Sequence, residues 1–484
     1  MRAAVTMLAV LLVACAAPSP PAPAGARQAF ESAFARAVGE APRALAAALD
    51  SAPLGRQTLR TSQIAVDVEG HLGAVQTRDG GWLVQVPANG ARILAYSTTE
   101  GTAGAVLNVR GTNTADVHTS QVALPRAVVP GDALVVASTG SGRGGYWDAP
   151  GRSVVDEMLA VVFVPYRVGP GLLRPPALGN SDLARFLRSI PIPESAVHVE
   201  RLPSVVDVAA LPVDWAAWGA AEPTIPYLTA LLQPFCGECY DGWATDTRTP
   251  DHQHPGYGTA YASVVSQALV QLCSTASLDA KRPLALAVAQ RGLDLVGAFC
   301  DGRRNYPLGG HSAGRKALIV LTGHMIGVEA IADPTAFLGP VFQEDGCYST
   351  QAWWFSGWTA GWRYSIATGS KLADPPATWG PVDAVAHDSW AWMVVGYMPQ
   401  VVGAQVGTAL AMRLLGRTRE MGTAFDGLVG QWMAGPPTWA DAQLRAVGIT
   451  LPWGSDYAMA RGAGFCAAAW RTAAQVGSPI PRPS

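Results

Sequence analysis

The sequence predicts a multidomain α+β protein in which an antiparallel β-sandwich, residues 57–167, is followed by an (α/α) toroid of helical hairpins, residues 226–484. Two observations lead to this fold class. Short apolar runs that alternate with polar residues and are separated by turn residues fill the first part, as in sandwiches. Apolar positions at helical spacing, joined by short or glycine-bearing loops, fill the second part and predict antiparallel hairpins. Because strands and helices do not alternate, we do not expect a parallel α/β sheet.

The amino end has the features of an export signal. A basic residue precedes an apolar stretch, residues 5–14, that is too short to span a bilayer. The box LVAC, residues 12–15, resembles that of bacterial lipoproteins, which implies cleavage before Cys15 and lipidation of that cysteine. Ala16 in place of an acidic residue resembles outer-membrane sorting. We therefore expect a lipoprotein signal over residues 1–15 and an anchor at the outer membrane, facing the periplasm or the cell surface, through the Cys15 lipid only. An ordinary secretory signal is the alternative.

The segments around the expected sandwich are assigned by composition. Residues 16–56 are expected to form a Pro- and Ala-rich tether, residues 16–27, followed by alanine-rich helices. Inside the sandwich, residues 79–81 (Asp-Gly-Gly) separate two apolar runs and predict a hairpin turn, because glycine adopts positive φ readily. Residues 168–225 are expected to be a linker and an irregular segment with one short helix over residues 181–189.

The expected toroid begins with a clean amphipathic stripe between Tyr261 and Leu272. The further helices are expected over residues 282–299, 315–331, 389–398, 401–415, 424–433 and 457–474. Pro283 is then tolerated in the first turn of its helix. Cys273 and Cys300 lie at the ends of two successive expected helices, and either a disulfide between them or buried free thiols fit the pattern.

Composition limits the classes of ligand. Formal net charge is −2 and 14% of residues are charged, so no basic excess points to nucleic acid. The sixteen Trp residues can pack in a core or stack on sugar rings. Trp353, Trp354 and Trp358 belong to the densest aromatic segment, and they are candidate sugar-binding platforms. A helix interface is the alternative reading of that segment.

Two polar, glycine-rich islands interrupt the helical part, at residues 251–258 and 305–316. If helical hairpins return the chain, both islands lie on the same face of a toroid. Their candidate site residues are His252, His254, Tyr257, Asn305, Tyr306, His311, Arg315 and Lys316. The second island opens a long apolar helix, whose amino end carries partial positive charge and is suited to an anion. A chance grouping of polar loop residues is the structural alternative.

These residue types suit β-elimination on a uronic acid. The reaction needs a cation or an amide that neutralises the sugar carboxylate, a role for Arg315, Asn305 or a protonated His such as His311. It also needs a base whose pKa lies near the working pH, for which His254 and Tyr257 are candidates. His252, Tyr306 and Lys316 are expected to contact the substrate.

Two other chemistries remain open. Glycoside hydrolysis needs two carboxylates flanking the bond, and the candidates form no recognisable pair in the sequence. They are Asp251, Asp294, Glu344, Asp345 and Asp388. A structural zinc ion is a minority alternative to having no cofactor, with ligands at Cys236, Cys239, His252 and His254.

Three motifs carry a family resemblance. QHPGYG at 253–258, GLDLVG at 292–297 and GGHSAGRKALIVLTG at 309–323, with GTALAMRLLG at 407–416 after them, resemble six-hairpin (α/α)-toroid proteins among carbohydrate-active enzymes. The likeness covers roughly residues 225–435. Alginate- and heparin-lyase toroids are similar in using Asn, His, Tyr and Arg together. The resemblance implies a polysaccharide substrate.

We therefore expect an exported, lipid-anchored polysaccharide lyase that cleaves an acidic, uronate-containing glycan. A glycoside hydrolase of the six-hairpin type and a non-catalytic glycan-binding surface lipoprotein are the alternatives.

Overall fold

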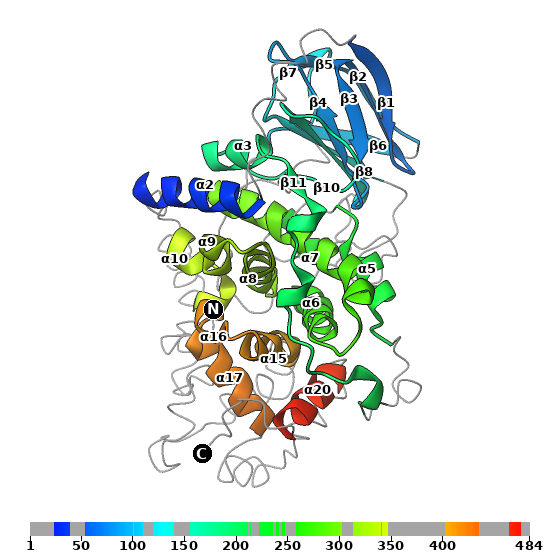
Figure 1. Cartoon of the computed structure of the whole chain (residues 1–484). Helices are drawn as coiled ribbons and strands as arrows, with labels where there is room; N and C mark the ends of the chain where they lie inside the picture. The colour runs from blue at the N-terminus through cyan, green and yellow to red at the C-terminus, as the bar shows by residue number, and fades with distance from the viewer. Residues whose placement is uncertain are drawn as a thin grey trace, which may run out of the picture.

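The structure, a computed structural model, describes residues 24–38, 54–99, 101–109, 120–139, 155–211, 213, 222–235, 239–241, 244–246, 258–302, 313–339, 341–346, 402–434 and 464–475. Within these residues the protein is a mixed α+β structure. Strands dominate as far as Val164, and helices dominate from Ile225 onward. Figure 1 shows the large sheets at one end of the molecule and the packed helices at the other.

Two sheets share an apolar core. One has the strand order β1-β2-β5-β7 and consists of β1 (Gly55–Arg60), β2 (Ile64–His71), β5 (Ala91–Thr98) and β7 (Arg126–Val128). The other has the order β3-β4-β9-β8-β6 and consists of β3 (Gly73–Gln76), β4 (Trp82–Gln85), β9 (Val155–Val164), β8 (Ala133–Thr139) and β6 (Thr102–Leu107). Val66, Leu134 and Phe163 are among the buried side chains that join the two sheets. In β2, buried and half-buried residues alternate, as the predicted period of two requires.

The second sheet is mixed, which corrects the expectation of a purely antiparallel arrangement. β4 runs parallel to β9, with Trp82 opposite Val161 and Gln85 opposite Val164. The predicted hairpin is confirmed, because β3 and β4 pair antiparallel and Gly80 in their turn has φ 79°. A period of two fixes which face of a strand is buried, but it carries no information on strand direction.

The segment between sheets and helices packs more closely than a linker would. It contains α3 (Asp182–Arg188), the pair β10 (Leu172–Leu173) and β11 (Ile192–Pro193), and the 3₁₀ turns η2 (Glu194–Ala196), η3 (Val199–Arg201) and η4 (Val208–Ala210). The predicted short helix is confirmed, since the Ser181 hydroxyl caps α3 by accepting from the Ala184 N–H. Leu173, Leu187 and Ile192 are buried in the helical core.

The helices form one large apolar core. They are α2 (Ala24–Val38), α5 (Ile225–Leu232), α6 (Gly258–Leu272), α7 (Leu278–Cys300), α8 (Arg315–Ile326), α9 (Glu329–Ala332), α10 (Pro334–Leu338), α11 (Gln343–Gly346), α15 (Val406–Leu414), α16 (Thr418–Met421), α17 (Thr423–Ala434) and α20 (Gly464–Gln475). The two-stranded pair β12 (Cys239–Asp241) and β13 (Ala244–Asp246) lies between α5 and α6 in the chain. α2 joins this core through Phe30, whose ring stacks 4.9 Å from that of Phe337.

Three helix limits differ from the expectation. α2 begins at Ala24, inside the segment expected to be a tether. α7 begins at Leu278 because the Ser277 hydroxyl accepts from the Ala280 N–H, so Pro283 lies beyond the first turn. α8 ends at Ile326, five residues short of the expected Ile331, because Gly327 adopts a left-handed conformation with φ 82°.

A disulfide between Cys273 and Cys300 is excluded, since both are free thiols. Cys273 precedes the start of α7 and Cys300 ends it. A helix of 23 residues separates its ends by about 35 Å at the usual rise per residue. A disulfide needs its Cα atoms within about 7 Å.

α7 is the helix within the described residues that is long and apolar enough to cross a membrane. Its most apolar window is 89% buried inside the protein, so core packing accounts for its composition.

A buried ion-pair network joins the sheets to the helices. The Arg174 guanidinium donates to both carboxylate oxygens of Asp294 in α7, at 2.9 and 2.6 Å. It also donates to Asp79 in the β3–β4 turn, at 2.9 and 2.6 Å. The Phe235 ring covers the guanidinium at 4.6 Å. Because Arg174 lies between the two carboxylates, it connects the β3–β4 turn to α7.

Candidate functional site

The amino ends of α6 and α8 are in contact. The Arg315 guanidinium lies over the Tyr261 ring, 4.4 Å from its centroid. A Cβ atom on Gly314, whose φ is 87°, would lie 3.0 Å from the Cα atom of Ala262. The island at 251–258 precedes α6 in the chain, and the island at 305–316 runs into the start of α8. The two islands are therefore joined to helix ends that contact each other.

Most of the predicted site residues lie outside the described residues. These are His252, His254, Tyr257, Asn305, Tyr306 and His311 in the islands, the three aromatic residues Trp353, Trp354 and Trp358, and the lipidation residue Cys15. Arg315 and Lys316 are the two that the structure places.

Arg315 is the first residue of α8, and its side chain is 1% exposed. One guanidinium nitrogen, Nη1, donates to the Ala313 carbonyl at 3.0 Å. Stacking on an aromatic ring and bonding to a local carbonyl hold the guanidinium at the junction. A fixed positive group at a helix amino end is suited to a negatively charged ligand.

Lys316 is held by the protein itself. Its ammonium donates to Asp345 at 2.5 Å and to the Met421 carbonyl at 3.1 Å, and it lies 5.9 Å from the Phe342 ring centroid. The side chain is 1% exposed. Because its ammonium is buried and bonded within the protein, we assign Lys316 a structural role in place of the expected substrate contact.

Glu344 is a buried carboxyl at the start of α8. It lies in α11 and is 2% exposed, and its Oε1 atom accepts from the Gly314 N–H at 2.7 Å. Burial raises the pKa of this carboxyl, although hydrogen bonds from backbone N–H groups and the charge of Lys316 oppose the shift. In the sequence it was one of five glycosidase candidates, and no local pattern marked it.

Gln405 also lies at this junction. It occupies the position just before α15, where its side chain makes no capping hydrogen bond, and it is fully buried. Its neighbour Ala404 packs in one cluster with Ala262 of α6 and Ala313, which precedes α8. The Ser266 hydroxyl, about two turns into α6, donates to the Ala404 carbonyl at 2.5 Å. The amino ends of α6, α8 and α15 therefore meet.

Two of the glycosidase candidates serve in ion pairs. Asp294 binds Arg174 and Asp345 binds Lys316. Asp251 and Asp388 lie outside the described residues. Glu344 is thus the one candidate, among those that the structure describes, that faces no cation in an ion pair.

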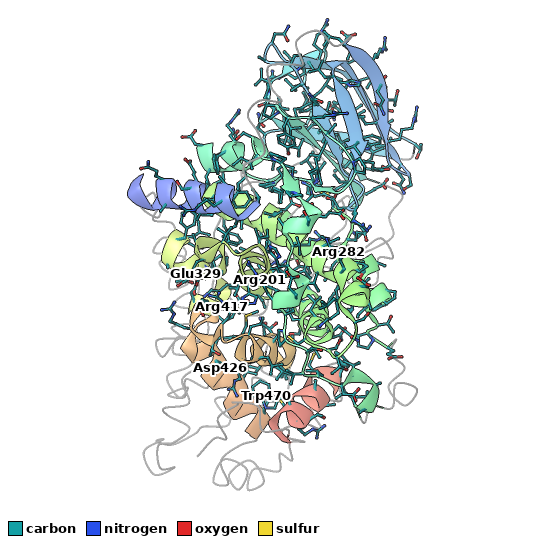
Figure 2. All side chains as sticks on the ribbon, in the orientation of Figure 1. Arg201, Arg282, Glu329, Arg417, Asp426 and Trp470 are labelled. Carbon is teal, nitrogen blue, oxygen red and sulfur yellow. The ribbon has the colours of Figure 1, made fainter. Side chains whose placement is uncertain are left out.

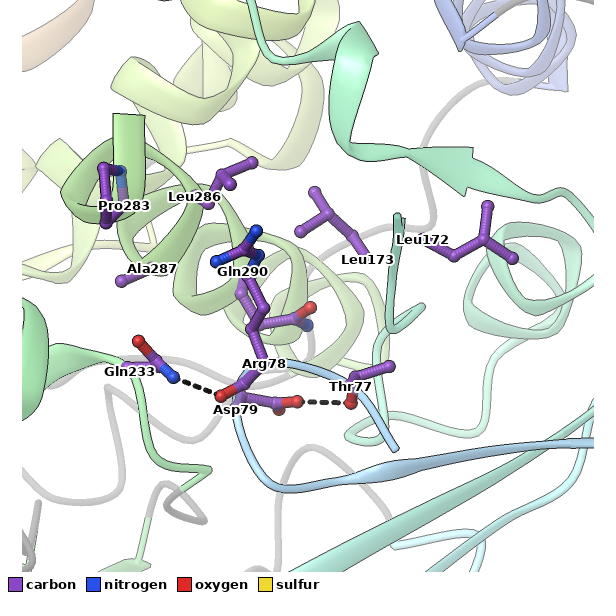
Figure 3. A pocket seen from close by; sticks show the side chains of 10 residues that line it. All are labelled: Thr77, Arg78, Asp79, Leu172, Leu173, Gln233, Pro283, Leu286, Ala287 and Gln290. Carbon is purple, nitrogen blue, oxygen red and sulfur yellow. Dashed lines mark hydrogen bonds between the residues drawn. The ribbon is translucent and has the colours of Figure 1, made fainter. Parts of the chain in front are cut away.

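The pocket in Figure 3 lies where the β3–β4 turn meets α7, away from this junction, and its lining includes Thr77, Asp79 and Gln290. Thr77 donates to Asp79 at 2.6 Å, and the Gln233 amide donates to the Arg78 carbonyl. The Gln290 amide is bonded to both backbone groups of Arg174, at 2.9 and 2.7 Å. These polar groups are all hydrogen-bonded to other groups of the protein. We therefore interpret the pocket as a gap in the packing between the β3–β4 turn and α7, and not as a ligand site.

Among the described residues, no cluster of three or more His, Cys, Asp or Glu side chains could hold a metal ion. The zinc hypothesis concerns residues whose side chains lie outside this part of the chain: Cys236, Cys239, His252 and His254. Only the backbone of Cys239, at the start of β12, is described.

The surface of the helical part carries further ion pairs. Figure 2 shows Arg417 beside Glu329, which it binds at 2.5 Å, and Asp426 near Trp470. Arg413 joins the latter two, since it binds Asp426 at 2.6 Å and lies 4.4 Å from the Trp470 ring centroid. Like Arg315, Arg413 is stacked on an aromatic ring, so it can be compared with Arg315.

Comparison of the chain with family models, with curated proteins and with solved structures finds no match.

Proposed function

We propose that this protein is an exported lipoprotein in which a β-sandwich precedes an (α/α) toroid, and that it cleaves an acidic, uronate-containing polysaccharide by β-elimination. The shared core of the two sheets supports the sandwich. The continuous helical core and the meeting of three helix amino ends support the toroid. The Cys15 lipid is the expected membrane anchor, at the outer membrane.

The contact between Arg315 and Tyr261 carries the proposal. It holds the amino-terminal part of α6 against the start of α8, and each of the two islands precedes one of these helices in the chain. One island supplies His254 and Tyr257 as candidate base and acid, with His252 beside them. The other supplies Asn305, Tyr306 and His311 for the sugar and its carboxylate. Arg315 is the proposed carboxylate neutraliser, which makes the C5 proton more acidic.

A panel of polyuronates and neutral polysaccharides tests the reaction. β-Elimination leaves a conjugated unsaturated uronate with strong ultraviolet absorbance, and it forms one new reducing end for each cut. We expect both signals on a polyuronate. New reducing ends without the absorbance would overturn the lyase and support hydrolysis, and binding without any product would leave a glycan-binding lipoprotein.

The role of Arg315 has a matched control in Arg413, which also stacks on an aromatic ring and is paired with Asp426. Arg315→Met is expected to lower kcat/KM by about 100-fold or more, because it removes a charge that acts on the developing anion. Arg413→Met removes an equivalent stack between helices and is expected to lower stability alone. Equal activities of the two variants, both folded, would exclude Arg315 from the site.

Glycoside hydrolysis is the second candidate, and Glu344 is the observation that favours it. A buried carboxyl with a raised pKa is what a general acid requires. The reaction needs a second carboxylate, and Asp251 and Asp388, which lie outside the described residues, are the candidates. Loss of kcat in Glu344→Gln, with reducing ends as the sole product of the wild type, would establish this reading.

A further inference from the structure

The Glu344 carboxyl uses only one of its two oxygens within the described protein. Oε1 accepts from the Gly314 N–H at 2.7 Å, which places the carboxyl at the amino end of α8, one residue before Arg315. Oε2 is buried and has no hydrogen-bond partner among the described residues. The neighbouring Asp345 differs, because it binds Lys316 and also accepts from Thr335 at 2.9 Å.

Gln405 also has buried polar atoms without a hydrogen-bond partner among the described residues, and here both side-chain polar atoms are affected. Its side chain is 0% exposed, and neither its amide nitrogen nor its amide oxygen has a hydrogen-bond partner within the described part of the chain. The residue before it, Ala404, contacts the residues that flank the Tyr261–Arg315 stack, namely Ala262 and Ala313. Gln405 therefore enters α15 beside the same junction.

Leaving such groups unbonded costs about 1–3 kcal/mol for each buried donor or acceptor. Two side chains with unbonded groups at one junction call for a polar partner beyond the described residues, and a bound ligand is such a partner. Neutral carboxyl and primary amide groups can both donate hydrogen bonds. Burial raises the pKa of Glu344 and thus favours its neutral form. Two neutral donors beside the Arg315 charge suit a small anion with several acceptor oxygens.

We propose that Glu344 and Gln405 form, beside Arg315, a subsite that binds the carboxylate of an acidic sugar through hydrogen bonds from neutral groups. This subsite deepens the proposed function and rests on it. Neutral donors stabilise a carboxylate by hydrogen bonding, and they add no further buried charge to those of Lys316 and Arg315. In a dry environment these hydrogen bonds are stronger than in water.

The burial of these side chains has a kinetic consequence. Arg315, Glu344 and Gln405 are 1%, 2% and 0% exposed. A sugar reaches them only after local rearrangement, so association is expected to be slower than for a preformed open site.

Titration calorimetry on the full chain tests the subsite, with oligouronates and their carboxyl-reduced counterparts as probes. Glu344→Gln keeps an acceptor for the Gly314 N–H and a donor for the ligand, so we expect affinity close to that of the wild type. Glu344→Ala and Gln405→Leu remove the donors, and each is expected to weaken oligouronate binding about 10-fold or more. Binding of the carboxyl-reduced oligosaccharides should not change between variants.

Glu420→Gln is the matched control. Glu420 is another buried glutamate with an unbonded Oε2 among the described residues, but it lies in α16 next to Arg417 and Arg419. We expect no change in affinity for either probe, and thermal unfolding of every variant verifies folding.

Two results of the binding titrations would overturn the subsite: equal oligouronate affinity in the wild type, Glu344→Ala and Gln405→Leu, or no preference of the wild type for oligouronates over the reduced probes. Formation of unsaturated product together with either result would leave the lyase standing and reject the subsite. Carboxylate-dependent binding that needs Glu344 and Gln405, without any product, would support the subsite and reject the lyase. A loss of kcat with intact binding in Glu344→Gln would show that the carboxyl is an acid or base instead, and would also reject the subsite.

Discussion

Two titratable side chains in the helical part respond to burial in opposite directions. Burial raises the pKa of the Glu344 carboxyl, and it lowers the pKa of the His324 imidazole. In both cases burial disfavours the charged form. The two residues therefore affect stability on opposite sides of the pH range.

Glu344 contributes stability at low pH. Because its folded-state pKa is raised, the contribution is fully present below its ordinary pKa and is lost as the pH rises through the raised value. Lys316 and Asp345 are the charged groups that act on it. Glu344→Gln mimics the neutral acid, so its free energy of unfolding should depend less on pH. Denaturant titrations at several pH values measure this, and parallel curves for wild type and variant would contradict it.

His324 contributes stability at high pH. Its Nε2 atom lies 3.1 Å from the Arg201 carbonyl, and its Nδ1 atom accepts from the Arg417 Nε–H at 3.4 Å, so the ring is held neutral. Burial lowers the pKa of His324, and the charges of Arg417 and Arg201 add to the effect, while the Arg201 carbonyl and Glu329 oppose it. Figure 2 labels Arg201, Arg417 and Glu329 in this region.

Since the pKa of His324 is lowered, its contribution is present above the ordinary pKa and is lost as the pH falls through the lowered value. His324→Gln offers the same donor and acceptor without a titration. Thermal unfolding of the wild type should fall more steeply than that of the variant between neutral and mildly acidic pH. A steeper fall in the variant would reverse the assigned sign.

At this scale the sequence indicated Arg315, but not its surroundings. The basic group at a helix start was visible as a pattern, because glycines precede it and an apolar run follows. The partners Tyr261, Glu344 and Gln405 come from other helices, and spacing along the chain does not reveal such contacts. The same limit led to the expectation that Lys316 binds substrate, although Asp345 already holds it.

At the scale of elements, local signals placed most of the helices that the structure describes. The stripe in α6, the Ser181 cap of α3 and the Asp-Gly turn before β4 are local in sequence and were predicted from it. The wrong helix limits in α7 and α8 arose where two local signals favour different ends for the same helix. Ser277 starts α7 before the proline, and Gly327 ends α8 inside an apolar run.

The packing of α7 on α8 depends on a glycine. A Cβ atom on Gly292 would lie 2.0 Å from the Thr322 hydroxyl oxygen and 2.7 Å from the Leu318 carbonyl oxygen. Gly292→Ala is therefore expected to cost about 1–3 kcal/mol through overpacking, even though alanine favours helix. Gly427→Ala in α17 is the control, since nothing lies within 4 Å of its Cβ position. The control should raise stability by up to about 1 kcal/mol. Similar effects in both variants would contradict this close approach.

At the scale of the whole molecule, the features that escaped prediction are those that join distant segments. Composition and period indicated a strand-rich part followed by a helix-rich part, which the described residues show. The parallel pairing of β4 with β9 and the Arg174 network each join positions far apart in sequence. Asp79 was read as a turn residue and Asp294 as a catalytic candidate, because each residue taken alone fits its local pattern.

The Arg174 network should couple the stability of the sheets to that of the helices. Arg174→Met leaves Asp79 and Asp294 buried without their cation, which is expected to cost about 3–5 kcal/mol. Arg78→Met is the control: Arg78 binds Glu194 at 2.6 Å, but its side chain is 55% exposed. An exposed pair contributes at most about 1 kcal/mol.

Denaturant unfolding followed by far-ultraviolet circular dichroism and by tryptophan fluorescence measures both the loss and the coupling. We expect coincident transitions in the wild type and separated transitions in Arg174→Met. Adding Asp79→Asn and Asp294→Asn to Arg174→Met removes the unpaired charges, so the triple variant should recover part of the lost stability. If Arg78→Met destabilises the protein as much as Arg174→Met does, burial of the network is not what joins the two parts, and the coupling must come from the apolar contacts of Leu83, Phe235 and Ala298.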